Sequence, residues 1–161
     1  MEILLPYAMK VGALLKARKE TIAVAESSTG GLIAAALLAV PGASAYFAGG
    51  GVLYTRKALM KLLALDEDAL RGQQPLTEDN VMFRARRVRE HLSATWGVSE
   101  SGVAGPTGNR YGFLPGHSVL AVSGPTEKAA TIKTGNTDRV TNMYAFATAA
   151  LELLAKTLEA K

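Results

Sequence analysis

The chain has 161 residues, of which 48% are apolar and 20% charged, and these proportions predict a single compact domain over residues 1–161. It contains no cysteine, which excludes disulfides, thiolate nucleophiles and cysteine-based metal sites. Because it has only two histidines, we expect no metal site and no cofactor. The formal net charge of +4 is too small to indicate a nucleic-acid-binding protein, but it suits a small anion such as a phosphate monoester.

The chain carries no sign of a membrane or export segment. The apolar stretch from Gly30 to Val40 is shorter than the roughly 18–20 residues that cross a bilayer. The first residues, MEILLPYAMK, lack the basic flank, apolar block and cleavage site of a signal peptide. Together with the absence of cysteine, these features predict a cytoplasmic protein without a membrane partner.

Helical and strand patterns alternate in the first half of the chain. Apolar residues at a period of 3.6 predict an amphipathic helix at the start, and the β-branched run TIAVA predicts a buried strand. The apolar segment after Gly31 predicts a helix that is buried on most sides. The predicted elements are helices over residues 5–17, 32–40 and 56–65, the last capped by Thr55, and strands over residues 21–25 and 52–54.

The alternation continues in the second half. The acidic residues after Thr77 predict the start of a helix with an apolar stripe from Val81 to Leu92. Its arginines, at positions 84, 86, 87 and 89, are expected to form a solvated face or salt bridges. The predicted elements are helices over residues 77–95 and 141–158 and strands over residues 98–103, 118–122 and 129–133. This order favours an α/β layered sheet.

The block Glu26-Ser27-Ser28-Thr29-Gly30-Gly31 places hydroxyls and glycines where a buried strand ends and a helix begins. Ligands bind at this edge of open α/β sheets, and a helix N-terminus offers free N–H groups to an anion. The alternative is that Ser28 or Thr29 only caps the helix. The block matches neither the phosphate-binding P-loop nor the dinucleotide fingerprint.

A second glycine-rich block, Gly102-Val103-Ala104-Gly105-Pro106-Thr107-Gly108, follows another predicted buried strand. Its glycines allow the backbone to approach a ligand closely. By itself the block is more typical of an ordinary turn.

Four blocks together, in this order and spacing, resemble the CinA C-terminal family, which comprises the nicotinamide mononucleotide deamidases. The blocks are AESSTGG (residues 25–31), PGASAYF (41–47), VLY (52–54) and SGVAGPTG (101–108). The resemblance implies a three-layer α/β/α sandwich with a mixed or largely parallel sheet, often as a homodimer. It also implies a small-molecule nucleotide as partner and hydrolysis of its carboxamide to the acid and ammonia.

The resemblance also implies roles for individual residues. Ser27 takes a nucleophilic or substrate-orienting role, and Ser44 and Tyr54 position the substrate or assist proton transfer. Ser28 stands where the family usually has cysteine. Backbone N–H groups of the first block would stabilise an oxyanion or hold phosphate. The implied substrate-binding residues are Thr29, Gly30, Gly31, Gly105, Pro106, Thr107 and Gly108.

The sequence departs from the family at the position of its general base. The family has a lysine five residues after the tyrosine, and this chain has Leu59 there. A leucine cannot take the proton of a serine that attacks an amide. Lys57 and Lys61 lie two positions to either side, about 200° away around a helix, so either would need a shift in register. His117 is another candidate base.

The late arginines of the family are missing in an ungapped comparison. The family has Gly-Asp-Arg and a further arginine four residues on, and these arginine positions fall on Thr137 and Thr141 here. An insertion of two residues would restore the first of them as Arg139. In the loop over residues 109–117, Arg110 is a possible substitute cation.

Two functional hypotheses therefore remain open. The chain is either an amidohydrolase acting on nicotinamide mononucleotide or a related amide, or a catalytically impaired family member that binds a ligand or a partner protein. Nucleic-acid binding through the arginine-bearing helix is disfavoured, because no aromatic stacking platform accompanies the small charge excess.

Overall fold

The computed structural model describes residues 1–160, and the chain alternates helices and strands as the sequence predicts. The strands are β1 (Ile22–Glu26), β2 (Phe47–Val52), β3 (Trp96–Val103), β4 (His117–Ser123) and β5 (Lys128–Lys133). The helices are α1 (Leu5–Arg18), α2 (Leu32–Leu38), α3 (Arg56–Leu62), α4 (Glu78–His91) and α5 (Arg139–Glu159), with 3₁₀ turns η1 (Ala43–Ala45) and η2 (Asp68–Leu70). None of the described helices is both long and apolar enough to cross a membrane.

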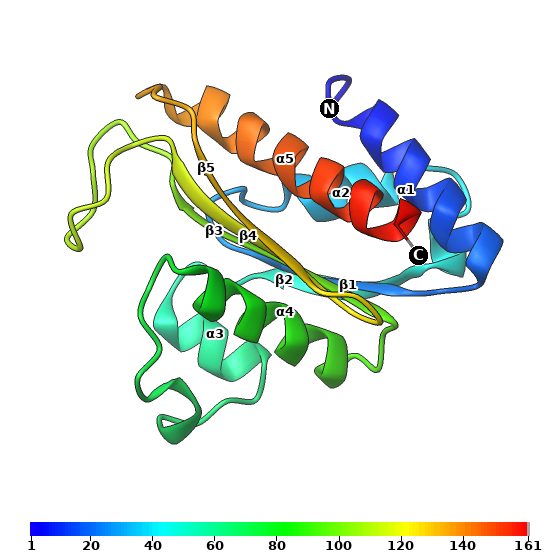
Figure 1. Ribbon diagram of the computed structural model, residues 1–161, viewed down its shortest axis with the longest axis horizontal. Coiled ribbons are helices and arrows are strands. Elements are labelled where there is room, and N and C mark those ends of the chain that lie inside the picture. Colours follow the sequence, from blue (N-terminus) through cyan, green and yellow to red (C-terminus); the bar gives the residue numbers. More distant parts are fainter. Residues whose placement is uncertain (161) are drawn as a thin grey trace.

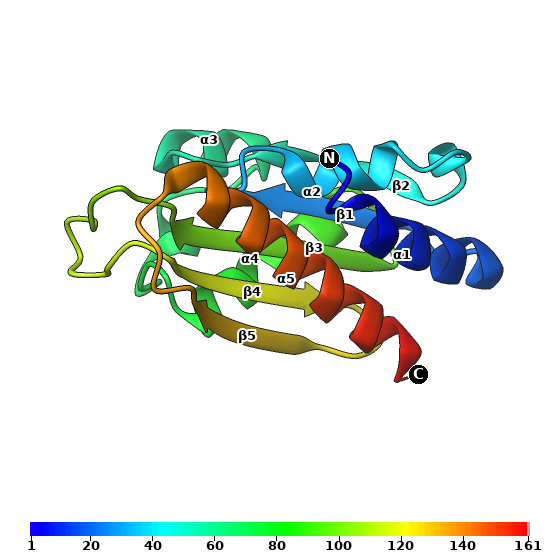
Figure 2. The same ribbon diagram turned by 90° about the horizontal axis from the view of Figure 1, so that it is seen from above.

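The strands form one mixed sheet in the order β2-β1-β3-β4-β5. Strand β1 pairs in parallel with β2 and with β3, whereas β3–β4 and β4–β5 are antiparallel hairpin-type pairs. Figure 2 shows α5 crossing the sheet obliquely. The α/β class and the mixed sheet are confirmed.

Helices cover both faces of the sheet, which gives the predicted three layers. Figure 1 shows α1, α2 and α5 on one face and α3 and α4 on the other. The larger core lies under α1, α2 and α5 and contains the fully buried Tyr46 and Trp96. Two smaller apolar clusters fill the space under α3 and α4.

The strand predicted over residues 52–54 is wrong in position, because β2 covers Phe47–Val52 and includes all three adjacent glycines. A Cβ at Gly50 would lie 2.4 Å from the carbonyl oxygen of Val24 on β1. The glycines therefore let two backbones approach, and they are not a loop before the strand.

Three predicted helices differ in detail, and one of them, α3, ends at Leu62, three residues before its predicted end. Helix α4 ends at His91, four residues early, because Ser93 adopts a left-handed φ of +51° and the N–H of Ala94 closes the end on the carbonyl of Arg89. Leu92, predicted to be buried, is consequently 37% exposed. Helix α2 is not buried on most sides, since Leu38 is 54% exposed.

Candidate functional site

The carboxyl ends of three parallel strands bring the predicted blocks to one edge of the sheet. Ser27 follows β1, Tyr54 follows β2, and the loop 105–108 follows β3. A cavity of about 610 Å³ with Ser27 and Tyr54 in its wall opens there, and an adjoining cavity of about 230 Å³ is bounded by Tyr54 and the loop. Both cavities share Tyr54, Gly102 and Asn109, so together we call them the groove.

Ser44 lies at the opposite edge of the sheet. It sits in η1, before β2 begins, whereas Tyr54 comes after β2 ends. The six residues of β2 separate the two positions by roughly 20 Å at about 3.3 Å per residue. Ser44 is exposed and lines neither cavity. Within one chain, the structure therefore does not bring Ser44 to Ser27 and Tyr54.

A buried carboxylate, Glu26, organises the start of α2. It accepts hydrogen bonds from the N–H groups of Gly31 (3.1 Å), Ile33 (3.0 Å) and Ala34 (2.8 Å) and from the Thr29 hydroxyl (2.7 Å). Burial raises the pKa of the Glu26 carboxyl, and the bond from Thr29 opposes that shift. The helix N-terminus thus already holds an anion, so its N–H groups are not free for an oxyanion or a phosphate.

A second buried carboxylate, Glu100 on β3, holds the loop after β1. It accepts from the N–H groups of Ser27 (3.1 Å) and Thr29 (3.0 Å), from the Thr29 and Ser118 hydroxyls (2.9 and 3.3 Å), and from the Ser28 hydroxyl in a short bond. Sequence reasoning missed Glu100, although a lone acid inside a strand that is otherwise buried signals a built-in polar site.

Glu100 separates the roles of the two neighbouring serines. The Ser28 hydroxyl donates to Glu100, whereas within the described residues the Ser27 hydroxyl has no hydrogen-bond partner in the protein, and Ser27 lines the larger cavity. Ser28 lines the smaller cavity, but its hydroxyl is held by Glu100, so Ser27 is the one of these two serines whose hydroxyl is free to bond a ligand. Thr29, Gly30 and Gly31 line neither cavity and shape the turn, with φ values of +65° and +101° at the two glycines.

The second block reaches the groove only in part. Gly105, Thr107 and Gly108 line the smaller cavity, whereas Pro106 is exposed and lines neither cavity. Gly105 has a φ of +106°, and a Cβ there would lie 2.5 Å from the carbonyl oxygen of Thr137. The loop therefore packs directly on the segment that leads into α5.

Arg139, the first residue of α5, supplies the cation of the smaller cavity. Its guanidinium donates to the carbonyl of Gly105 (2.7 Å) and to the Tyr54 hydroxyl (3.4 Å). Thr141 is exposed, and its N–H is capped by Asp138. Arg139, the residue that an insertion of two would align with the first family arginine, thus lies in the groove, whereas Thr137 and Thr141 line neither cavity. Four residues after Arg139 stands Met143, next to Gly30, so the second arginine is missing.

The groove contains no replacement for the missing general base. Leu59 is 5% exposed and lines the larger cavity. Lys57 and Lys61 border a separate surface hollow on the outer side of α3. His117 packs its ring on Phe113, with 4.7 Å between centroids, and lines neither cavity. In the described part of the chain, no lysine, histidine, aspartate or glutamate side chain lines the groove.

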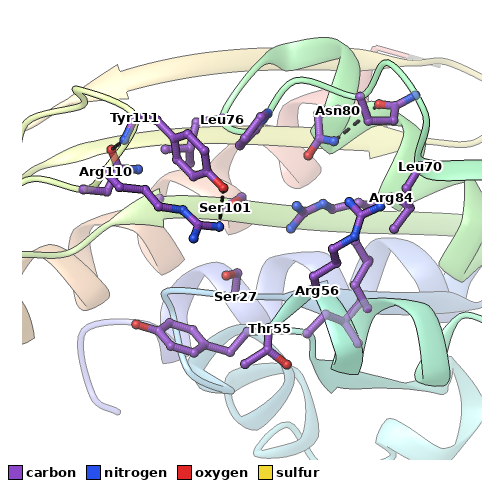
Figure 3. A pocket seen from close by; sticks show the side chains of 17 residues that line it. Ser27, Thr55, Arg56, Leu70, Leu76, Asn80, Arg84, Ser101, Arg110 and Tyr111 are labelled. Carbon is purple, nitrogen blue, oxygen red and sulfur yellow. Dashed lines mark hydrogen bonds between the residues drawn. The ribbon is translucent and has the colours of Figure 1, made fainter. Parts of the chain in front are cut away.

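Arg84 is a site residue that sequence reasoning missed. Arg86 pairs with Glu127 (2.5 Å) and Arg87 with Glu90 (3.3 Å), as a helix of surface salt bridges predicts. Arg84 instead lines the larger cavity, and Figure 3 shows it facing the same space as Ser27 and Ser101. The sequence does not distinguish Arg84 from the other arginines of α4. Only the position of α4 over the sheet decides which of these arginines points into the cavity.

Comparison with known proteins agrees with the fold and extends over nearly the whole chain. Residues 5–158 match the family model of the CinA C-terminal domain. A CinA-like protein of Salinibacter ruber is 40% identical over 148 residues, which are 92% of this chain and 36% of that protein. A CinA-like protein of Desulforapulum autotrophicum is 39% identical over 91% of this chain and 35% of its own length. The chain thus spans about a third of the length of these curated relatives.

Solved structures show the same fold. A CinA superfamily protein from Klebsiella pneumoniae superposes with a TM-score of 0.89 at 23% identity, covering 98% of this chain and 99% of the other. The competence/damage inducible protein CihA of Agrobacterium tumefaciens gives a TM-score of 0.87 at 26% identity, covering 98% and 96%.

Proposed function

Because the chain belongs to the CinA C-terminal domain family, we propose that its groove binds a pyridine mononucleotide, such as nicotinamide mononucleotide, without hydrolysing the amide above the background rate. The observation that carries this proposal is the buried Leu59 in the wall of the cavity that Ser27 also lines. A serine hydroxyl attacks an amide only when a neighbouring group removes its proton. The groove offers arginines, which stay protonated, and no group with a pKa near neutrality.

Nucleotide binding is supported by the division of the groove into two unlike ends. The smaller cavity has Arg139 and the backbone of the glycine-rich loop around it, which suits a phosphate. The larger cavity has a floor of leucines and the ring of Tyr54, which suits a flat aromatic ring. In a pyridine mononucleotide, a ribose connects the phosphate to the aromatic ring.

Amide hydrolysis by Ser27 is the second candidate. It is favoured by the Ser27 hydroxyl, which is free of hydrogen bonds to described residues, and by Tyr54, whose hydroxyl lies 3.4 Å from the Arg139 guanidinium. In that case Tyr54, a phenol that lines the same cavity as Ser27, would relay the proton from Ser27.

Ammonia release from nicotinamide mononucleotide distinguishes the two candidates. The proposal predicts that the wild-type protein and Ser27→Ala release ammonia at the same background rate. Turnover that Ser27→Ala abolishes would establish the amidase instead. Binding of the same nucleotide, measured by calorimetry on wild type and Arg139→Gln, should be weaker in the variant, and equal affinity would remove the phosphate assignment.

A further inference from the structure

The walls of the groove are strongly one-sided in charge. Four arginines line them, at positions 56, 84, 110 and 139, and no acidic side chain of the described chain does so. Three of these arginines have partners. Arg56 pairs with Glu67, Arg110 donates to the Tyr111 hydroxyl at 2.7 Å, and Arg139 donates to Gly105. The groove is therefore built for an anion.

Arg84 is the exception among the four. Within residues 1–160 it makes no hydrogen bond or salt bridge, and its Nε atom is buried without a partner. Burial lowers the pKa of the Arg84 guanidinium, and the Glu100 carboxylate opposes that shift. Glu100 itself already accepts five hydrogen bonds from the loop and from Ser118. A cation with no partner in a half-buried site is unfavourable until an anion reaches it.

Arg84 and Arg139 line different cavities of the groove, and Arg139 donates only to neutral oxygen atoms. Arg139 lines only the smaller cavity and Arg84 only the larger one, and Tyr54 lines both. Figure 3 shows Arg84 and Ser27 facing one space. A ligand that satisfies both ends carries one anionic group at Arg139 and a second anionic group near Ser27.

We infer that the groove recognises the nucleotide of an aromatic carboxylic acid, such as nicotinate mononucleotide, in preference to the carboxamide nucleotide. This inference rests on the proposed function and names the substrate class of the same site. The phosphate lies at Arg139, the pyridinium ring lies against Tyr54, and the ring carboxylate accepts hydrogen bonds from Arg84 and from the Ser27 hydroxyl.

The chemistry of the two ring substituents explains the preference. A guanidinium is a fork of N–H donors that fits both oxygens of a carboxylate. A carboxamide offers one acceptor oxygen, and its NH₂ group would face the remaining N–H donors. The positively charged pyridinium ring is common to both nucleotides, and its attraction to the Tyr54 ring does not discriminate between them.

Calorimetric titration with nicotinate mononucleotide and nicotinamide mononucleotide tests the inference, because these probes differ only in the ring substituent. Wild type should bind the acid at least about tenfold more tightly than the amide. Arg84→Gln should abolish that preference by weakening the acid alone, whereas Arg139→Gln should weaken both nucleotides by a similar factor. Arg86→Gln, on the outer side of α4, is the matched control and should change neither affinity.

Each other outcome is decisive. Equal affinities, or a preference that survives in Arg84→Gln, would overturn the carboxylate assignment and leave nucleotide binding intact. A preference for the amide would overturn it too, and would assign recognition to Asn80, whose buried Oδ1 has no partner one turn before Arg84. If neither nucleotide bound, the proposed function itself would fail, and the inference with it.

Discussion

Replacing Leu59 by lysine should convert the groove into a working amidase site. Leu59 is 5% exposed and lines the cavity that Ser27 also lines, so a lysine there can extend into the cavity and keep its amine near the serine. Burial disfavours the charged form of a lysine, and the arginines of the same cavity disfavour it further. The amine should therefore be partly neutral near pH 7 and able to accept the serine proton.

The size of the gain follows from the burial. At an ordinary pKa of about 10.4, about 0.1% of a lysine is neutral at pH 7.5, whereas a pKa of about 8 makes about a quarter of it neutral. A positioned general base contributes about 10²–10⁴ in rate. Ammonia release from nicotinamide mononucleotide should rise by that factor over wild type, with a rate that increases with pH up to the pKa of the new lysine. Because Arg139 already occupies the groove, the substitution Thr137→Arg, which the ungapped comparison suggests, is not needed.

Leu62→Lys is the matched control, because Leu62 lies on the same helix and is 52% exposed. It should show wild-type background. A Leu59→Lys protein that keeps its circular dichroism spectrum, binds the nucleotide and still releases no ammonia would refute the claim that the missing base is what prevents turnover.

Three further predictions concern the fold. Gly50→Ala should destabilise the protein by about 1–3 kcal/mol in urea unfolding, because the new Cβ would meet the Val24 carbonyl at 2.4 Å, while Gly51→Ala, with its nearest neighbour at 3.5 Å, should be nearly neutral; equal effects would contradict the close-approach argument. Glu100→Gln should cost about 3 kcal/mol by chemical denaturation, because the loop donors lose a charged acceptor, and an unchanged midpoint would exclude Glu100 as the organiser. Arg86 lowers the pKa of Glu127 from 4.5 to about 2. Because this ion pair is partly exposed, Glu127→Gln should lower the free energy of unfolding at pH 7 by only about 0.5–1 kcal/mol. Because a depressed pKa stabilises only the ionised form, that loss should shrink as the pH falls from 4.5 toward 2, and a loss independent of pH would contradict it.

Local patterns were sufficient for most of the fold. The run TIAVA, the cap at Thr55 and the acids after Thr77 each predict their element because the cause lies within a few residues. The glycines of β2 could not be placed in this way, because their reason is the Val24 backbone on another strand. The end of α4 depends on a left-handed conformation at Ser93. Glycine usually marks such a position in a sequence, and this one is a serine.

The residues of the candidate site also differ in whether local sequence or the fold reveals their role. Ser27, Tyr54 and the second glycine-rich block were identifiable, since each follows a strand at one edge of the sheet. Glu100 and Arg84 were not, because their importance comes from what the fold places opposite them. For Ser44 the sequence predicted a place in the site that the chain does not give it. Its block resembles the family, but it lies before β2 and not after it.

One nuclear magnetic resonance experiment tests the central claim most directly, with nicotinamide mononucleotide in excess over the wild-type protein in a single tube. Saturation transfer to the pyridinium protons reports binding, and the conversion of the ring signals to those of the acid reports hydrolysis. The account predicts saturation transfer that Arg139→Gln weakens, and no conversion beyond that in a Ser27→Ala sample. Conversion in wild type that is lost in Ser27→Ala, or no saturation transfer at all, would contradict it.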